Sequence, residues 1–434
     1  AVSPLDCMGC GECVTVCPTA AIEMKPQESQ SEQQAAFDYC VENIRKKDNI
    51  PGVVSEVSVK GSQFNQPLLE FSGSCAGCAE TSYARLITQL FGEKMFISNA
   101  TGCSSIWGGT ASISPYTTNK ASGHGPAWIN SLFEDNAEHG LGMQIGYETV
   151  RANLITKVEA LKGKNAELDA VIDKFLETKN NTKANDEPAK ALIAALEACG
   201  CEESKEILKD KQYLAKKSFW IFGGDGWAYD IGYGGLDHVL ASGHDVNVMV
   251  FDTEMYSNTG GQASKASNIG EVCQFAAAGK EISKKSLAEI CMTYGYIYVA
   301  QIALGANMAQ AVKAIAEAEA YPGPSIIIGY APCELHGVKG GMTNCQNEMK
   351  KAVEAGYWNL FTFNPANKAQ GKNPFTLTSK AVDNEKYQAL LSNETRYSRL
   401  TRAFPDRAKE LFARNQQVAN DRYEHLTRLV DLYK

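Results

Sequence analysis

The chain of 434 residues lacks several features that would assign it at once to a class of protein. It has no run of about 18 consecutive apolar residues, so we expect no membrane-spanning helix. It has no excess of positive charge: its formal net charge is −8 and its pI is about 5.5, which argues against a nucleic-acid-binding protein. It has no internal repeat. Its hydrophobic content of 44% supports sizeable cores in two or three domains.

The first residues, Ala-Val-Ser-Pro-Leu-Asp, lack an initiating Met and lack the basic and apolar regions of a secretory signal. We therefore expect the chain to begin inside a longer polypeptide and to reside in a cytoplasm. The 14 cysteines raise the alternative of a disulfide scaffold, but such scaffolds are typical of short secreted chains. Here the cysteines stand at ligand-like spacings, which favours metal ligation in a reducing, oxygen-poor compartment.

A run of cysteines marks the N-terminal module, which we assign to residues 1–50. Its spacing is C-x2-C-x2-C-x3-C-P, by which bacterial ferredoxins hold 4Fe–4S clusters. In two-cluster ferredoxins the run occurs twice, and each run contributes to both clusters. This chain has the run once, so we expect the second run upstream of Ala1. Cys40 has no partner at such a spacing and is interpreted as a buried thiol. The predicted ligands are Cys7, Cys10, Cys13 and Cys17.

Residues 51–360 alternate strand-like and helix-like patterns, which favours an α/β domain with a doubly wound parallel sheet. In such a sheet, ligands bind at the carboxyl ends of the strands. Strands are predicted at 95–98, 218–223, 246–251, 296–302 and 325–330, and a helix at 308–320.

Two further segments carry no recognisable chemistry. Residues 148–217 are polar and helix-prone, and we interpret them as a helical insertion between sheet elements. Cys199 and Cys201 within it are spaced too closely for a usual cluster motif and are interpreted as structural. Residues 361–434 form a C-terminal extension, a helical tail in which a long helix is predicted from Pro405.

Two strand ends carry the residues of a predicted thiamine-diphosphate site. One apolar strand runs into Gly224, Asp225 and Gly226, and a second runs into Thr253 about 28 residues later, a spacing that suits a βαβ unit. The glycines let the backbone approach a diphosphate, and an Asp with a later polar side chain can hold its divalent cation. The predicted magnesium ligands are Asp225, Thr253 and the carbonyl of Met255.

Four central cysteines form a second candidate metal site. Cys75 and Cys78 form a C-x2-C pair, and Cys103 and Cys333 follow expected strand ends. Thiolates at one sheet edge could converge on a single metal centre beside the cofactor loop. Zinc in an all-cysteine site is the alternative. Thiamine chemistry beside an electron acceptor favours a 4Fe–4S cluster.

In combination these motifs resemble the C-terminal part of the multidomain pyruvate:ferredoxin (flavodoxin) oxidoreductases. The resemblance covers at least residues 1–360. It rests on residues 75–80 (Cys-Ala-Gly-Cys-Ala-Glu), 100–109 (Ala-Thr-Gly-Cys-Ser-Ser-Ile-Trp-Gly-Gly), 224–230 (Gly-Asp-Gly-Trp-Ala-Tyr-Asp) and 252–262 (Asp-Thr-Glu-Met-Tyr-Ser-Asn-Thr-Gly-Gly-Gln).

The resemblance implies roles for particular residues. The central cysteines would hold a 4Fe–4S cluster proximal to thiamine diphosphate, and the N-terminal run would serve a medial and a distal cluster. Asn258 would face the substrate and is the expected catalytic residue. The six histidines, His336 included, are interpreted as structural. The expected cofactor-binding residues are Glu80, Cys103, Gly224, Asp225, Gly226, Trp227, Thr253, Glu254, Met255, Tyr256, Ser257 and Asn258.

The activity implied by the resemblance is reversible oxidative decarboxylation of pyruvate with coenzyme A to acetyl-CoA and CO2. Electrons would pass singly through 4Fe–4S clusters to ferredoxin or flavodoxin. Two alternatives stay open: an oxidoreductase for another 2-oxo acid, and an electron-transfer module without catalysis. We expect upstream domains of the same enzyme to supply the glutamate that activates thiamine and the contacts to pyruvate and coenzyme A. A homodimer is also expected.

Overall fold

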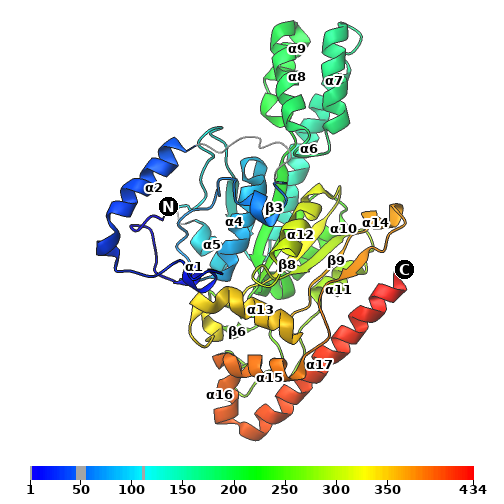
Figure 1. The fold of residues 1–434 in the computed structure, drawn as a ribbon. Helices are drawn as coiled ribbons and strands as arrows, with labels where there is room; N and C mark the ends of the chain where they lie inside the picture. Colours follow the sequence, from blue (N-terminus) through cyan, green and yellow to red (C-terminus); the bar gives the residue numbers. More distant parts are fainter. Residues whose placement is uncertain (1, 45–54, 110–112) are drawn as a thin grey trace.

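The computed structural model describes residues 2–44, 55–109 and 113–434. Its centre is an eight-stranded sheet with strand order β10-β9-β7-β8-β4-β3-β1-β2 (Figure 1). Neighbours from β7 to β2 pair in parallel, while β9 and β10 pair antiparallel at one edge. The strands are β1 (Met95–Ala100), β2 (Ala127–Ser131), β3 (Ser218–Gly224), β4 (Asn247–Asp252), β7 (Tyr298–Ile302), β8 (Ser325–Tyr330), β9 (Phe361–Phe363) and β10 (Phe375–Leu377).

Helices cover both faces of this sheet. On one face, Gly140 of α6 (Asn136–Glu159) lies so close to β3 that a Cβ there would meet Ile221 at 2.5 Å. On the other, Tyr83 of α4 (Ala79–Phe91) packs against β4 and β8. The helices α10 (Tyr233–Ala241) and α12 (Met308–Ala320) contact α6 and α4 respectively. The predicted doubly wound α/β fold is therefore confirmed.

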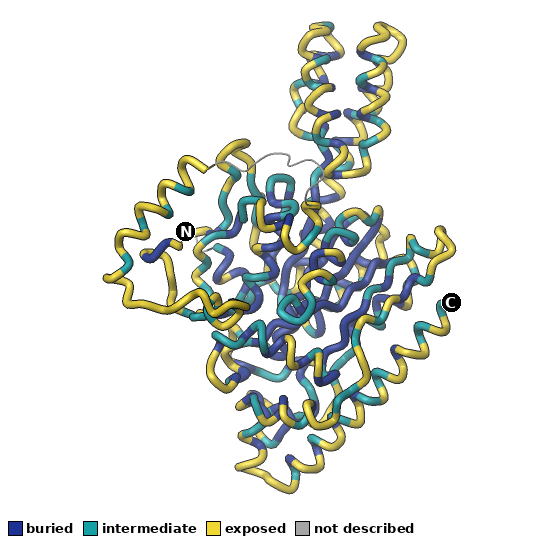
Figure 2. The backbone as a smooth tube through the Cα atoms, in the orientation of Figure 1, coloured by how far each residue is buried: buried dark blue, intermediate teal, exposed yellow. Residues whose placement is uncertain are grey.

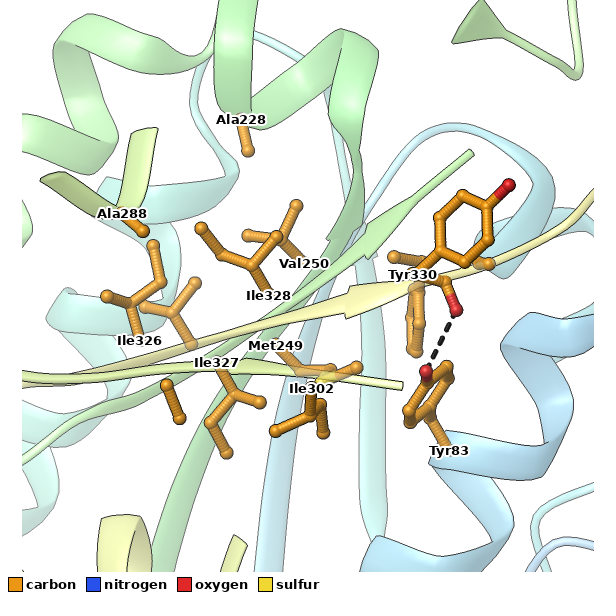
Figure 3. Close-up of a cluster of buried hydrophobic side chains, with 14 of the residues drawn as sticks. Tyr83, Ala228, Met249, Val250, Ala288, Ile302, Ile326, Ile327, Ile328 and Tyr330 are labelled. Atoms are coloured by element: carbon orange, nitrogen blue, oxygen red, sulfur yellow. Dashed lines mark hydrogen bonds between the residues drawn. The ribbon is translucent and has the colours of Figure 1, made fainter. Parts of the chain in front are cut away.

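The centre of the sheet forms the hydrophobic core (Figure 3). Every residue of β4 and β8 is buried, as the largely apolar runs of central strands in a parallel sheet predict. Ile328 and Val250 lie on the same side as Ala288, while Ile327 and Met249 point to the opposite side. The Tyr83 hydroxyl donates to the carbonyl of Tyr330 at 2.8 Å, which ties α4 to the carboxyl end of β8.

The predicted insertion is helical and projects from the sheet (Figure 1). The outer part of α6 continues into α7 (Ala166–Thr178), α8 (Asp186–Cys199) and α9 (Glu202–Leu208). These helices have their own hydrophobic core, in which Leu154, Ile172, Phe175, Leu192 and Leu196 are buried. Because this core is separate from the core of the sheet, the insertion packs without altering the strand ends that carry the predicted site.

The C-terminal extension belongs to the central domain more closely than we expected. The expected boundary at residue 360 falls inside continuous structure, because β9 and β10 extend the sheet past it. Three helices then follow: α15 (Asn384–Asn393), α16 (Thr395–Ala403) and α17 (Pro405–Leu432). The long helix from Pro405 is confirmed, and Leu411 and Leu426 are buried on its inner side.

The N-terminal module is mostly exposed (Figure 2). Residues 2–44 form α1 (Glu12–Thr15), a 3-10 turn η1 (Gln27–Gln30) and α2 (Glu32–Asn43), with no strand among them. Cys40 lies on α2 and is only half-buried, so the interpretation as a buried thiol is wrong. The expected end of the module near residue 50 lies outside the described residues. In the described part of the chain, none of the helices combines the length and apolarity needed to cross a bilayer.

Candidate cofactor and cluster site

A pocket lies at the carboxyl ends of β1, β3 and β4, where an open α/β sheet binds its ligands. Eleven of the twelve residues expected to bind the cofactor line it, and Glu254 is the exception. Asn258 lines it as an exposed residue, free to face a ligand. The pocket is lined by Glu80, Thr101, Gly102, Cys103, Phe133, Gly224, Asp225, Gly226, Trp227, Thr253, Met255, Tyr256, Ser257, Asn258 and Thr259.

Gly224 and Gly226, at the carboxyl end of β3, have different surroundings. A Cβ at Gly226 would lie 2.5 Å from the Tyr256 ring, so this position must be glycine for the two loops to pack. A Cβ at Gly224 would meet only the Phe251 carbonyl, at 3.8 Å, which is ordinary contact. Gly224 is therefore not required by packing within the chain. It leaves open the part of the pocket where a diphosphate would approach the backbone.

Three oxygens converge at the floor of the pocket. The Thr253 hydroxyl lies 2.8 Å from Asp225 Oδ1 and 3.1 Å from the Met255 carbonyl oxygen. Magnesium binds oxygens at about 2.0–2.1 Å in octahedral geometry, which sets neighbouring ligands about 3 Å apart. Burial, and next the charge of Asp252, raise the pKa of Asp225 well above its usual range. A divalent cation would offset both effects, so this donor set fits magnesium.

Ser264 is a part of this arrangement that the sequence did not reveal. Its hydroxyl donates to Asp225 Oδ2 at 2.6 Å, while the Thr253 amide donates to Oδ1 at 3.1 Å. Both carboxylate oxygens are thus held in place before any cation arrives. Ser264 lies outside the two strand-end motifs, and no spacing rule connects it to Asp225.

Glu80 lies at the pocket wall, at the start of α4. The Trp107 indole donates to Glu80 Oε2 at 2.7 Å. Burial raises the pKa of this carboxyl to about 7, against the opposing effect of that hydrogen bond. The side chain can therefore hold or release a proton near neutral pH, next to Cys103 and the predicted cofactor.

The four central cysteines share one neighbourhood. Cys78 precedes α4, Cys103 begins α5 (Cys103–Gly108), and Cys333 follows β8. Burial raises the pKa of Cys103, as do, to a smaller extent, Glu80, Cys333 and then Cys75. Burial, and next the charge of Glu80, raise the pKa of Cys78, with a smaller effect from the charge of Cys333. Within residues 2–44, 55–109 and 113–434, no three His, Cys, Asp or Glu side chains are grouped closely enough to hold a metal ion.

Cys13 lies in α1, Cys7 and Cys10 precede this helix, and Cys17 follows it. Cys7 and Cys13 are exposed, and Cys10 and Cys17 are half-buried. The Cys17 sulfur accepts a hydrogen bond from the Ala21 amide at 3.3 Å, and such backbone bonds lower the pKa of the Cys17 thiol. The thiolate is the form that ligates iron, and a lowered pKa favours it.

A single turn contacts both cysteine loops. This turn is η6 (Met342–Asn344). A Cβ at Gly77, inside the Cys75–Cys78 loop, would lie 2.6 Å from the Met342 carbonyl, and one at Gly11 would lie 3.1 Å from Thr343. The N-terminal cysteine run and the Cys75–Cys78 loop therefore pack against consecutive residues of the same short turn.

Glu254 turns away from the pocket into a buried ionic network. Its carboxylate lies 3.0 Å from the Lys284 ammonium and 2.8 Å from the Arg396 guanidinium. Burial opposes ionisation, but these two cations lower the pKa of Glu254 to about 2. Its backbone has a positive φ of 62°, which the network holds in place. Glu254 thus supports the loop between Thr253 and Met255.

His336 links the two halves of the site. Its Nε2 lies 2.7 Å from the Thr253 carbonyl, and its Nδ1 accepts from the Cys333 amide at 3.4 Å. The ring is fully buried, and burial lowers its pKa to about 3. A neutral ring that donates through Nε2 and accepts through Nδ1 satisfies both contacts, in keeping with a structural histidine.

The fold and this site define a thiamine-diphosphate-type domain joined to an iron–sulfur module. Residues 208–328 match the family described as "Thiamine pyrophosphate enzyme, C-terminal TPP binding domain", and residues 1–23 match the family "4Fe-4S binding domain". These matches confirm thiamine diphosphate and iron–sulfur clusters as the cofactors that the chain is built to carry.

The more particular likeness is to pyruvate oxidoreductases, which confirms the resemblance expected from the motifs. The chain is 49% identical to pyruvate-flavodoxin oxidoreductase of Klebsiella pneumoniae over 99% of its length. It is 50% identical to the protein of that name from Enterobacter agglomerans and 50% identical to pyruvate:ferredoxin oxidoreductase of Moorella thermoacetica, in each case over 99% of its length. The chain spans about 37% of the length of each of these relatives.

Proposed function

We propose that this chain is the C-terminal, cofactor-binding and electron-transferring part of an enzyme that oxidatively decarboxylates pyruvate with coenzyme A. Ferredoxin or flavodoxin is the proposed electron acceptor. The observation that carries the proposal is the pocket in which the oxygens of Asp225, Thr253 and Met255 converge beside Cys103. The relatives named above support pyruvate as the substrate.

When bound, thiamine diphosphate supplies an electron sink for decarboxylation of a 2-oxo acid, and the clusters carry electrons away singly. Asp225, with Thr253 and the Met255 carbonyl, would hold the magnesium ion that neutralises the diphosphate. Gly224 and Gly226 would let the backbone approach the diphosphate. Asn258, exposed at the pocket, would donate to the substrate carbonyl region.

The proposed electron path leads from the pocket to the protein surface. Cys75, Cys78, Cys103 and Cys333 would hold the proximal cluster. Two clusters at Cys7, Cys10, Cys13 and Cys17 would be shared with upstream sequence. The turn η6, which packs against both cysteine loops, would keep the proximal and the next cluster close together. The exposed N-terminal module is where an acceptor protein would dock.

The complete activity needs more than this chain. We propose that upstream domains supply the glutamate that activates thiamine, the pyruvate contacts and the coenzyme A contacts, and that the enzyme is a homodimer. The part of the relatives that this chain does not span leaves ample length for such domains.

Replacement of Asp225 tests the function. Asp225→Ala should abolish magnesium-dependent binding of thiamine diphosphate, measured by isothermal titration calorimetry, while iron per chain stays near the wild-type value. The matched control is Asp230→Ala, a nearby carboxylate that pairs with the exposed Lys265 and not with the pocket oxygens. Normal cofactor affinity in the Asp225 variant would contradict the assignment.

A further inference from the structure

The turn between α8 and α9 lies at the outer end of the insertion, away from the central sheet (Figure 1). Two thiols lie in contact at this turn. Cys199 is the last residue of α8, and Cys201 immediately precedes α9. Between them Gly200 adopts the left-handed conformation, with φ 65°, which reverses the chain. The two sulfurs are 3.2 Å apart. The sequence led us to interpret both cysteines as structural, but Cys199 is exposed.

We propose that Cys199 and Cys201 form a reversible redox-active dithiol whose oxidant is a low-molecular-weight disulfide. A disulfide bond is about 2.05 Å long, so closure requires the sulfurs to approach by only about 1 Å. Side-chain rotation on either side of Gly200 can supply this movement. A disulfide in so small a ring is strained, which makes it easy to reduce again.

The reaction is a balanced thiol–disulfide exchange. The Cys199 thiolate attacks one sulfur of the external disulfide, forms a mixed disulfide and releases one small thiolate. The Cys201 thiol then loses its proton and attacks the Cys199 sulfur, which releases the second small thiol. Two electrons pass from the protein thiols to the external disulfide, and the released thiolates take up the two protons.

The surroundings indicate which sulfur reacts first. Cys199 is exposed and Cys201 is half-buried, so an external disulfide reaches Cys199 more easily. Hydrogen bonding from Ser204, and next from Cys201, lowers the pKa of the Cys199 thiol, with a smaller effect from the charge of Lys164. Cys201 is held by Ser204, whose hydroxyl lies 3.1 Å from its sulfur. Cys199 is therefore the attacking thiol and Cys201 the resolving thiol.

The chain allows a direct readout of this reaction. Cleavage after Lys190 and Lys205 by trypsin yields one peptide that contains both cysteines and no other. The anaerobically purified holoenzyme would be equilibrated with glutathione and glutathione disulfide at varied ratios, alkylated with iodoacetamide and digested. We expect this peptide to become lighter by two hydrogen atoms and resistant to alkylation as the disulfide fraction rises, with reversal by dithiothreitol. Complete alkylation of both thiols at every ratio would overturn the proposal.

Single substitutions test the order of attack. Cys201→Ser should accumulate a glutathione adduct at Cys199, because the resolving thiol is missing, whereas Cys199→Ser should accumulate at least fivefold less adduct. The matched control Cys40→Ser, on the distant helix α2, should leave oxidation of the peptide unchanged. Circular dichroism would verify that the insertion stays helical in each variant. Equal adduct formation in both variants, or none in Cys201→Ser, would contradict the proposed mechanism.

Discussion

At the scale of single residues, substitution of Gly224 tests whether the space beside it is a cofactor-binding pocket. Because its Cβ position is open within the chain, Gly224→Ala should leave the thermal midpoint of unfolding nearly unchanged. The added methyl group should obstruct the diphosphate and weaken thiamine diphosphate binding by about tenfold or more, which corresponds to about 1.4 kcal/mol. Calorimetric titration in the presence of magnesium measures this loss.

Gly226→Ala is the matched variant for that measurement. Its methyl group would meet the Tyr256 ring at 2.5 Å, so we expect a loss of about 1–3 kcal/mol in the free energy of unfolding. Unchanged cofactor affinity in Gly224→Ala would show that the diphosphate does not approach the backbone at this strand end.

Glu271 should make stability depend on pH. It is fully buried beside Arg396, and burial raises its pKa to about 7, against the opposing effect of that arginine. An unfolded Glu ionises near 4.3, so the stabilisation from the protonated form is complete below that value and is lost as pH rises through about 7. Glu271→Gln mimics the protonated form at every pH.

The free energy of unfolding of Glu271→Gln, relative to wild type, should therefore rise by roughly 1–3 kcal/mol between pH 5 and pH 8. Urea denaturation at the two pH values measures this change. A difference between the two proteins that does not vary with pH would show that Glu271 is ionised throughout.

Much of the pocket could be predicted at the residue scale because many of its lining residues lie on two short motifs at strand ends. Asp225 and Thr253 were found from the glycine turn and the second strand alone. Ser264 was missed, because its place beside Asp225 depends on the path of the chain after Gly260. Glu254 lies inside a motif, yet the ionic network around Lys284 and Arg396 turns its side chain to the opposite side.

At the scale of elements, the loop from Thr253 to Met255 depends on Arg396 at the start of α16, which pairs with Glu254. Its guanidinium lies 2.8 Å from Glu254 and 2.7 Å from Glu394, and all three side chains are buried. Removal of one partner of a buried ionic network leaves uncompensated charge. Arg396→Met should therefore lower the free energy of unfolding by about 3–5 kcal/mol, as measured by urea denaturation.

Arg407→Met provides the control for that experiment. Arg407 lies on α17, and its ion pair with Glu281 is largely exposed to solvent. An exposed pair contributes about 0–1 kcal/mol, so this variant should be nearly as stable as wild type. Equal losses in the two variants would mean that the network around Arg396 does not stabilise the loop.

Long elements with a clear period were predictable, and short ones were not. The helix α12 and the strand β8 have the predicted bounds, because a long amphipathic pattern and a continuous apolar run specify them locally. The strands β9 and β10 have three residues each and exist because β9 pairs with β7 and β10 pairs with β9. Tertiary pairing of this kind leaves no local pattern in the sequence.

At the scale of the whole molecule, the sheet brings together chemistry from distant parts of the chain. Motifs from residue 75 to residue 333 meet at one edge, and the N-terminal module packs beside them through η6. The chain spans about 37% of its relatives, so the proposed catalysis joins this edge to domains that lie elsewhere in the enzyme. The proposed electron transfer thus depends on a cluster directly beside the proposed thiamine-diphosphate pocket.

Diffraction at the iron absorption edge tests this claim most directly. Crystals of the anaerobically prepared chain, grown with thiamine diphosphate and magnesium, would yield an anomalous map of its metal sites. We predict an iron–sulfur cluster bound by the sulfurs of Cys75, Cys78, Cys103 and Cys333, beside a diphosphate whose magnesium contacts Asp225. A single zinc ion among these cysteines, or Cys333 turned away from the metal, would contradict the account.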